Sequence, residues 1–278
     1  MLGINGKDYK LCLLDTNALS SFLQKPKTWI NFFEKEFSFD KTVICYSAFT
    51  LSELYYRQEL FDKYLDFFSV FPSAILDGHE SIFNKELEHY DSCEKINPIV
   101  IVPSSIQDVK LNLKEKLKLT IEKSSFLYNS DYWKKGQSEV LSSIVALKKN
   151  FPPKRDKYSI EDIEYFNMIV STFQISIRNR EFASRIVQSG VTIDLNKFPS
   201  LKSTSYFVFY KFYPDKRKPI NSDVFDIIIS ALLPYVDFFI TEGNLYDIIR
   251  KIKMNHLFLE NIEVYKLKDI NKIIGKNN

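Results

Sequence analysis

The chain has 278 residues, of which 45% are apolar and 26% are charged. This length and composition indicate a globular protein of one large or two small domains with a sizeable buried core. Its 24 Phe and 16 Tyr exclude a disordered chain, and its 7 Gly exclude a collagen-like one. Its 3 Cys are too far apart for a CxxC metal or redox site, which favours a reducing, cytoplasmic location.

Charge is unevenly distributed along the chain, although the net charge is only +3. Residues 110–220 hold 21 basic and 11 acidic side chains, whereas the segments on either side are net acidic. A basic middle favours a polyanionic partner, although a skewed genome composition explains the same excess. We expect no membrane span, because acids and a proline interrupt the most apolar stretch, 224–240.

The first third of the chain alternates between strand and helix patterns. Apolar runs predict buried strands at 11–14 and 42–46. The run at 11–14 is also too short for a secretory signal. Polar residues start the helices that we expect over 15–33, 47–68 and 79–91.

The middle of the chain, 92–215, is predicted to be mostly helical. Apolar side chains recur there at three- and four-residue spacing, and Ser159 begins a helix that ends just before Gly190. After residue 216 we expect a helix over 221–234, a strand over 238–240, a helix to about 253 and a strand over 262–267. Alternation at both ends of the chain predicts an α/β fold, with a parallel sheet covered by helices on both faces.

Five acids are expected where parallel sheets bind their ligands, beyond the carboxyl ends of the strands. Asp15 and Glu242 follow predicted strands, and Glu53 lies early in the helix after the second strand. Asp223 and Asp226 are three residues apart near the start of another helix. Because clustered carboxylates repel one another, this pattern favours a bound Mg²⁺ or Mn²⁺ that activates water against a phosphate.

Each acid also has a purely structural interpretation. Asp15 and Asp223 suit the beginnings of helices, and the others suit turns or exposed helix faces. Asp226 is harder to explain in this way, because it lies in an apolar helix and an unpaired buried carboxylate is costly. Asn17 and Thr241 are placed to orient a carboxylate or a water.

Four short segments occur together in an order that is typical of one family. They are LLDTN at 13–17, LSEL at 51–54, NSDVFDIIISA at 221–231 and FFITE at 238–242. In these segments the chain resembles the PIN-domain ribonucleases. The family pattern has an acid after the first strand, a Glu that opens a helix, an Asp that heads a buried helix, and an acid after a strand ending in Thr.

The resemblance implies a three-layer α/β/α fold with a central parallel sheet, and Mg²⁺- or Mn²⁺-dependent hydrolysis of RNA phosphodiesters. Asp15, Glu53 and Asp226 would be the core metal-binding and catalytic acids, with Asp223 and Glu242 as further ligands. The chain departs from the family in having Glu242 where Asp is more common. It is also about twice as long as the small single-domain toxins of the family.

The resemblance further divides the chain into a PIN-like core formed by 1–91 and 216–278, and a helical basic insertion at 92–215. The implied substrate is RNA, single-stranded or structured such as tRNA. Many relatives are toxins paired with an antitoxin or act in phage defence, and many form homodimers. The candidate side chains for binding RNA phosphates are Lys154, Arg155, Lys157, Lys216, Arg217 and Lys218.

Two other functions stay open at this point. The same fold would serve as a non-catalytic module that binds RNA or a protein. Another metal-dependent phosphoryl hydrolase, such as a phosphatase, is disfavoured because no DxD follows the first strand and no Gly-rich phosphate loop is present. No motif places a His for catalysis, which disfavours a His-based nuclease and a Ser–His–Asp hydrolase.

Overall fold

The structure is a computed structural model of the chain. It describes residues 2–4, 7–37, 41–71, 73–92, 94–101, 112–123, 130–154, 157–190 and 192–275.

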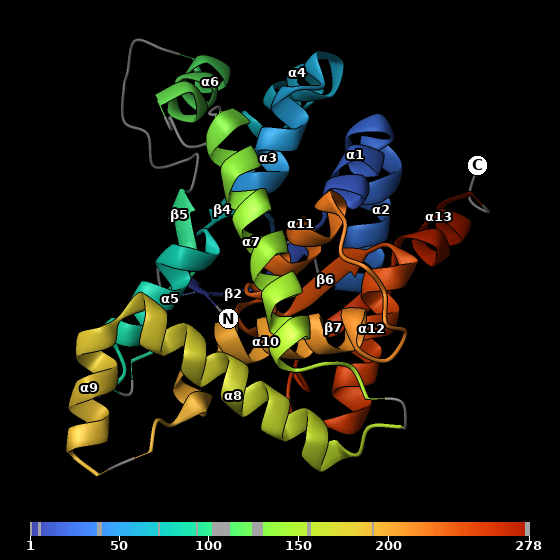
Figure 1. The fold of residues 1–278 in the computed structure, drawn as a ribbon. Coiled ribbons are helices and arrows are strands. Elements are labelled where there is room, and N and C mark those ends of the chain that lie inside the picture. The colour runs from blue at the N-terminus through green and yellow to red at the C-terminus, as the bar shows by residue number, and fades with distance from the viewer. Residues whose placement is uncertain are drawn as a thin grey trace.

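A mostly parallel sheet forms the middle layer of the fold (Figure 1). The strands are β1 Leu2–Ile4, β2 Lys7–Leu14, β3 Thr42–Ser47, β4 Ser73–Leu76, β5 Ile99–Ile101, β6 Phe238–Thr241 and β7 Glu263–Lys266. Their order is β5-β4-β3-β2-β6-β7, with β1 paired to β2 outside this path. The pairs from β4 to β7 are parallel, whereas β5 and β1 pair antiparallel with their neighbours.

The helices of the first half are α1 Thr16–Gln24, α2 Pro26–Phe37, α3 Ala48–Tyr55, α4 Gln58–Phe68, α5 His79–Glu88, α6 Leu113–Lys123 and α7 Ser130–Asn150. Those of the second half are α8 Ile160–Arg178, α9 Arg180–Gln188, α10 Pro199–Phe212, α11 Asn221–Ser230, α12 Gly243–Asn255 and α13 Leu267–Gly275. Two 3-10 turns, η4 Leu195–Lys197 and η5 Leu233–Tyr235, complete the described elements.

Alternation along the strands defines the two faces of the sheet. Leu11 and Leu13 of β2 join one hydrophobic cluster, and Cys12 and Leu14 join another. The first cluster contains side chains from α5, α7, α8, α10, α11 and α12. The second contains side chains from α1, α2, α3, α4, α6 and α13. Helices therefore cover both faces, and the predicted three-layer α/β/α fold is confirmed.

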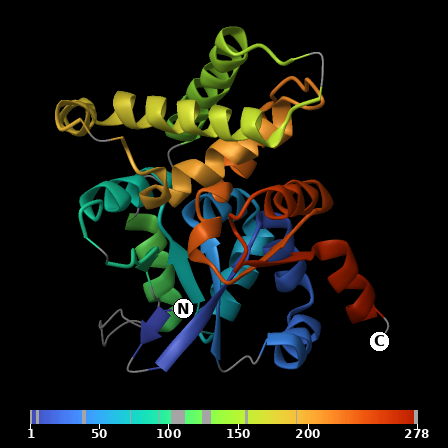
Figure 2. The ribbon, with the colours of Figure 1, turned by 90° about the horizontal axis from the view of Figure 1, so that it is seen from below.

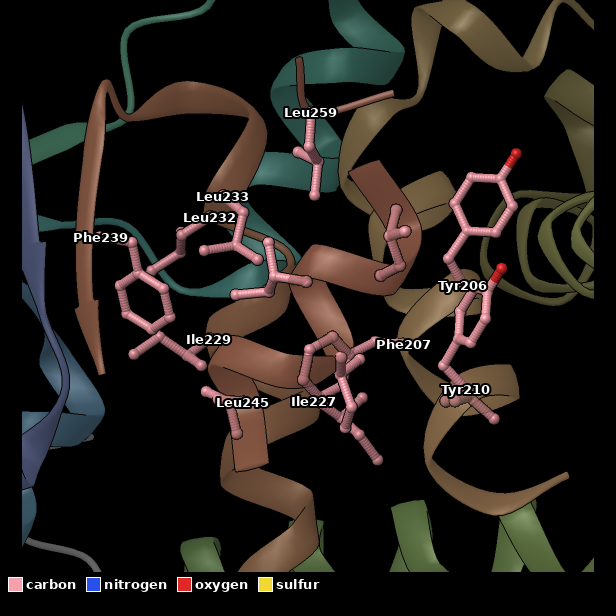
Figure 3. Packing of buried hydrophobic residues seen from close by; sticks show 14 of the residues in the cluster. Tyr206, Phe207, Tyr210, Ile227, Ile229, Leu232, Leu233, Phe239, Leu245 and Leu259 are labelled. Carbon is pink, nitrogen blue, oxygen red and sulfur yellow. The ribbon is translucent and has the colours of Figure 1, made fainter. Parts of the chain in front are cut away.

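Helix α10 is buried on nearly all sides, with every side chain from 205 to 213 below the surface. Phe207 of α10, Ile227 of α11 and Leu245 of α12 belong to the same buried hydrophobic cluster (Figure 3). The segment 206–212 is rich in β-forming aromatic residues, yet it is helical because burial among other helices outweighs intrinsic propensity. Helix α10, from the middle of the chain, therefore packs in the same hydrophobic cluster as side chains of the sheet.

Glu86 of α5 is a buried acid that caps the first turn of α10. Its carboxylate accepts hydrogen bonds from the Ser200 amide (2.7 Å) and the Ser200 Oγ (2.6 Å), and from the Tyr235 hydroxyl. Burial raises the pKa of Glu86 to about 7, although these hydrogen bonds oppose the rise. We refer to Glu86, Ser200 and Tyr235 as the Glu86 pocket.

Three helices that were predicted to be continuous are interrupted. The helix expected over 15–33 breaks at Lys25, before Pro26 begins α2. The helix expected to end just before Gly190 breaks at Asn179, whose side chain caps α9 by accepting from the Phe182 amide at 2.9 Å. The helix expected over 47–68 divides into α3 and α4. Strand β4 was not predicted.

Candidate active site

Asp15 lies at the carboxyl end of β2 and caps α1. Its Oδ1 accepts from the Ala18 amide at 2.7 Å. Its Oδ2 accepts from the Thr241 hydroxyl at 2.6 Å and from the Glu242 amide at 3.1 Å. Asp15 therefore joins the ends of β2 and β6. Strand β3 lies on one side of β2, and β6 lies on the other. The strand order therefore changes direction at β2, and α/β proteins bind ligands at such a switch point.

The surroundings of Asp15 disfavour a negative charge. Burial raises the pKa of Asp15 to about 6, and the neighbouring Glu242 carboxylate raises it further, while the bond from Thr241 lowers it. Glu242 itself is exposed. A cation at this point would therefore stabilise the ionised form of Asp15.

Glu53 of α3 faces the same end of the sheet. Its Oε2 accepts a hydrogen bond from the Thr16 hydroxyl, next to Asp15 in the chain. Burial raises the pKa of Glu53. The hydrogen bond from Thr16 and the positive charge of Arg57 lower it, and the negative charge of Asp226 raises it. Phe49 and Phe225 stack with ring centroids 3.7 Å apart, which holds α3 against α11 and explains why Glu53 and Asp226 interact.

Asp223 and Asp226 of α11 share one buried cation, the ammonium of Lys211 on α10. Lys211 Nζ lies 3.1 Å from Asp223 Oδ1 and also contacts Asp226 Oδ2, and only 1% of the lysine side chain is exposed. Asp223 is buried and further held by Arg217 (2.8 Å) and by the Ile220 amide (2.8 Å), so its oxygens are satisfied within the protein.

Asp226 is more open than Asp223, with 30% of its side chain exposed. Burial raises its pKa, and the charge of Lys211 opposes the rise. The sequence interpretation that Asp226 needs a partner therefore agrees with the ion pair to Lys211. We refer to Asp15, Glu53, Asp223, Asp226 and Lys211 as the carboxyl-edge cluster.

The predicted acids lie at the same end of the sheet, but they do not surround one common point. Asp15 interacts with Glu242, Glu53 interacts with Asp226, and Thr16 links the two pairs. In the ranges that the structure describes, no three His, Cys, Asp or Glu side chains are close enough to hold one metal ion. Of the two supporting residues, Thr241 contacts Asp15, and Asn17 is exposed at the start of α1.

The predicted RNA-binding side chains divide into two groups by position. Arg217 is engaged with Asp223, while Lys216 and Lys218 on either side are exposed next to the start of α11. Lys154 is paired with Asp162 in the loop before α8. Lys157 is exposed in the same loop, and Arg155 lies outside the described residues.

Sequence reasoning missed Lys211, which forms ion pairs with two of the five acids. The signal was a single lysine among aromatic residues in YFVFYKFY, 206–213. Because a buried ammonium is costly without a counter-charge, a lysine in such a segment indicates a buried acid elsewhere in the chain.

None of the helices in the described part of the chain has both the length and the hydropathy that a membrane span requires. Compared with protein-family models, with curated proteins and with solved structures, the chain matches none.

Proposed function

We propose that the protein is a metal-dependent endoribonuclease. Asp15, Glu53 and Asp226 would hold Mg²⁺ or Mn²⁺, although these three side chains would have to move closer together than they are in this structure to share one ion. The observation that carries this proposal is that Asp15 and Glu53, both partly buried, follow the neighbouring parallel strands β2 and β3, and that Asp226 of α11 interacts with Glu53. Glu53 and Asp226 repel each other there, and Asp15 and Glu242 do the same. Such repulsion is relieved by a cation.

The donor set suits a hard divalent cation, because all of the donors are carboxylate oxygens. Lys211 contacts Oδ2 of Asp226. A cation at Asp226 would therefore share this carboxylate with Lys211 or take its place. When bound, a divalent cation at such a site polarises a phosphoryl oxygen and lowers the pKa of a bound water.

The protein's own groups would supply the rest of the chemistry. Asp15 is fixed by Thr241, so its carboxylate has one defined orientation. Glu53 is held at Oε2 by the Thr16 hydroxyl, so Oε1 would be the oxygen that it offers to the metal ion or to a water. Lys216 and Lys218, exposed beside α11, would neutralise flanking phosphates, so binding would weaken with salt.

The test is cleavage of labelled single-stranded RNA, tRNA and single-stranded DNA in Mg²⁺, Mn²⁺ and EDTA. We expect metal-dependent cleavage of RNA that falls at least about a hundredfold in Asp226→Asn, since loss of a metal ligand removes several kcal/mol of transition-state stabilisation. Asp91→Asn is the matched control, because this acid is exposed and lies outside the cluster. Equal cleavage by Asp226→Asn and wild type would overturn the proposal.

A non-catalytic module that binds RNA or a protein is the second candidate function. The contact between Lys211 and Asp226 favours it, because this carboxylate already has a counter-charge. The same assay separates the two candidates. RNA that is bound but not cut in every metal condition would establish the binding module.

A further inference from the structure

Lys266 ends the strand β7 at the same edge of the sheet as the candidate active site. Strands β6 and β7 are parallel, and their register aligns Lys266 with Thr241, whose hydroxyl donates to Asp15. Lys266 therefore lies at the carboxyl edge, where α/β sheets bind ligands. Strand β7 is the last strand of the sheet on this side, and Figure 2 shows the helix that follows it, α13 in dark red, at the outside of the fold.

The ammonium of Lys266 lies over the first turn of α12. A Cβ atom added at Gly243, the first residue of α12, would be 2.9 Å from Cε of Lys266 and 3.3 Å from its Nζ. Nζ is also 5.5 Å from the ring centroid of Tyr246. Gly243 directly follows Glu242, whose amide donates to Asp15. The glycine thus leaves room for a cation close to the backbone that connects β6 with α12.

The ion pair of Lys266 leaves its charge available to a ligand. Nζ lies 3.7 Å from Oδ1 of Asp247, which is longer than a hydrogen bond. The side chain of Asp247 is 60% exposed and that of Lys266 is 30% exposed. A partly exposed pair of this kind stabilises a protein by at most about 1 kcal/mol. The pair alone therefore gives little reason for a lysine at this place.

The two cations at the carboxyl edge have different surroundings. Lys211 is buried and engaged with Asp223 and Asp226, so it is enclosed by acids. Lys266 is partly exposed, on the side of Asp15 where Glu242 presents a negative charge to solvent. A polyanion that approaches Asp15 from this side meets the repulsion of Glu242, which a neighbouring cation offsets.

We propose that Lys266 is a positioning residue that binds a phosphate of the RNA strand next to the phosphate that is cut. The part of this inference that concerns cleavage rests on the proposed nuclease function. The contact with a phosphate is tested separately, by binding in EDTA, where metal-dependent cleavage does not occur.

The first experiment measures the dissociation constant of a labelled single-stranded RNA in EDTA at several salt concentrations. Lys266→Met should weaken binding roughly three- to tenfold and reduce the salt slope by about 0.7, as expected for one lost phosphate contact. Lys266→Arg should bind nearly as wild type. Lys272→Met is the matched control, because it removes the same charge from an exposed lysine that also pairs with an acid, Asp269 at 3.2 Å.

Asp247→Asn separates a phosphate contact from a structural ion pair. This variant removes the partner of Lys266 and keeps the ammonium, so it should bind RNA at least as tightly as wild type. A loss of RNA affinity equal to that of Lys266→Met would assign the effect to the ion pair and overturn the proposal.

Gly243→Ala moves the ammonium without removing it. The backbone of Gly243 is not left-handed, so alanine fits the helix, and the new Cβ displaces only the flexible end of Lys266. Gly243→Ala should weaken RNA binding by no more than Lys266→Met does, and it should cause no further loss in the Lys266→Met background. An equal loss in that background would show that the glycine acts independently of Lys266, contrary to the proposal.

Cleavage in Mg²⁺ or Mn²⁺ distinguishes this inference from the proposed function. Lys266→Met should raise KM and change kcat little, because a phosphate beside the reacting one is bound equally in the ground and transition states. If Lys266→Met binds RNA as wild type does, the inference fails, whatever the result with Asp226→Asn. If RNA is never cut but Lys266→Met still binds it more weakly, the nuclease proposal fails and the phosphate contact stands. A wild type that binds no RNA would overturn both.

Discussion

The Glu86 pocket and the carboxyl-edge cluster hold buried acids in different ways. In the Glu86 pocket, one carboxylate accepts hydrogen bonds from an amide and two hydroxyls, and these three donors are neutral. In the cluster, carboxylates face one another, and a buried lysine serves two of them. The comparison teaches that burial alone does not identify a functional acid. The distinguishing feature is that several carboxylates lie near one another at the ligand-binding edge of the sheet and have charged side chains as partners.

The largest expected effect comes from removing the positive charge of Lys211 from the carboxyl-edge cluster. Lys211→Met should lower the free energy of unfolding by about 3–5 kcal/mol, because it leaves Asp223 and Asp226 without their shared counter-charge. Urea denaturation measures the loss. Lys202→Met on the same helix is the control, with an expected change below about 1 kcal/mol because its partner Asn196 is neutral and exposed. A small loss of unfolding free energy in Lys211→Met would show that the carboxylates of the cluster do not need the ammonium of Lys211.

The pH dependence of stability tests the other region of the comparison, the Glu86 pocket. The folded-state pKa of Glu86, about 7, lies above its ordinary value of 4.5, so the folded protein binds this proton more tightly than the unfolded chain. Its contribution to stability is therefore complete below about pH 4.5 and declines as pH rises to about 7, by up to about 3 kcal/mol.

Glu86→Gln removes this titration and keeps a hydrogen-bonding side chain in the pocket. Relative to wild type, the variant should become progressively more stable between pH 4.5 and pH 7. Thermal or urea unfolding at a series of pH values measures the difference. Parallel stability curves for the two proteins would mean that Glu86 does not titrate in this range.

The smallest expected effect is that of Asp15→Asn on stability. Asn also caps helices well, and the substitution removes a carboxylate whose ionisation burial disfavours. Because it weakens the contact with the Glu242 amide, the two effects nearly cancel, within about 1 kcal/mol at neutral pH. Circular dichroism melting measures it. Extensive unfolding would instead assign Asp15 a mainly structural role, like that of Glu86.

Much of the sheet was predictable from local patterns. The runs at 11–14, 42–46 and 238–240 are apolar, short and bounded by polar residues, and they form β2, β3 and β6. Strand β4 escaped prediction because its four residues, SAIL, are too few to show a period. The helix breaks at Lys25 and Asn179 depend on caps of one or two residues, which periodicity does not detect.

The candidate site was predictable only in part, for a related reason. Asp15 could be placed because it directly follows a strand, and Glu53 because it lies in the helix after the next strand. Asp226 could be singled out as an acid in an apolar helix. Lys211 could not, because its partners lie on another helix and α10 has no amphipathic pattern of its own. A helix buried on all sides shows no polar face from which its orientation could be read.

The pairing of β2 with β6 has a consequence for the synthesis of the chain. Leu13 of β2 aligns with Cys45 of β3 on one side and with Phe239 of β6 on the other, more than two hundred residues later. As the chain leaves the ribosome, β2 can pair with β3 early, while its other edge waits for nearly all of the remaining sequence. An unpaired, apolar central strand is open to wrong pairing during that interval. Folding of the complete sheet is therefore expected to be slow, limited by this one long-range contact.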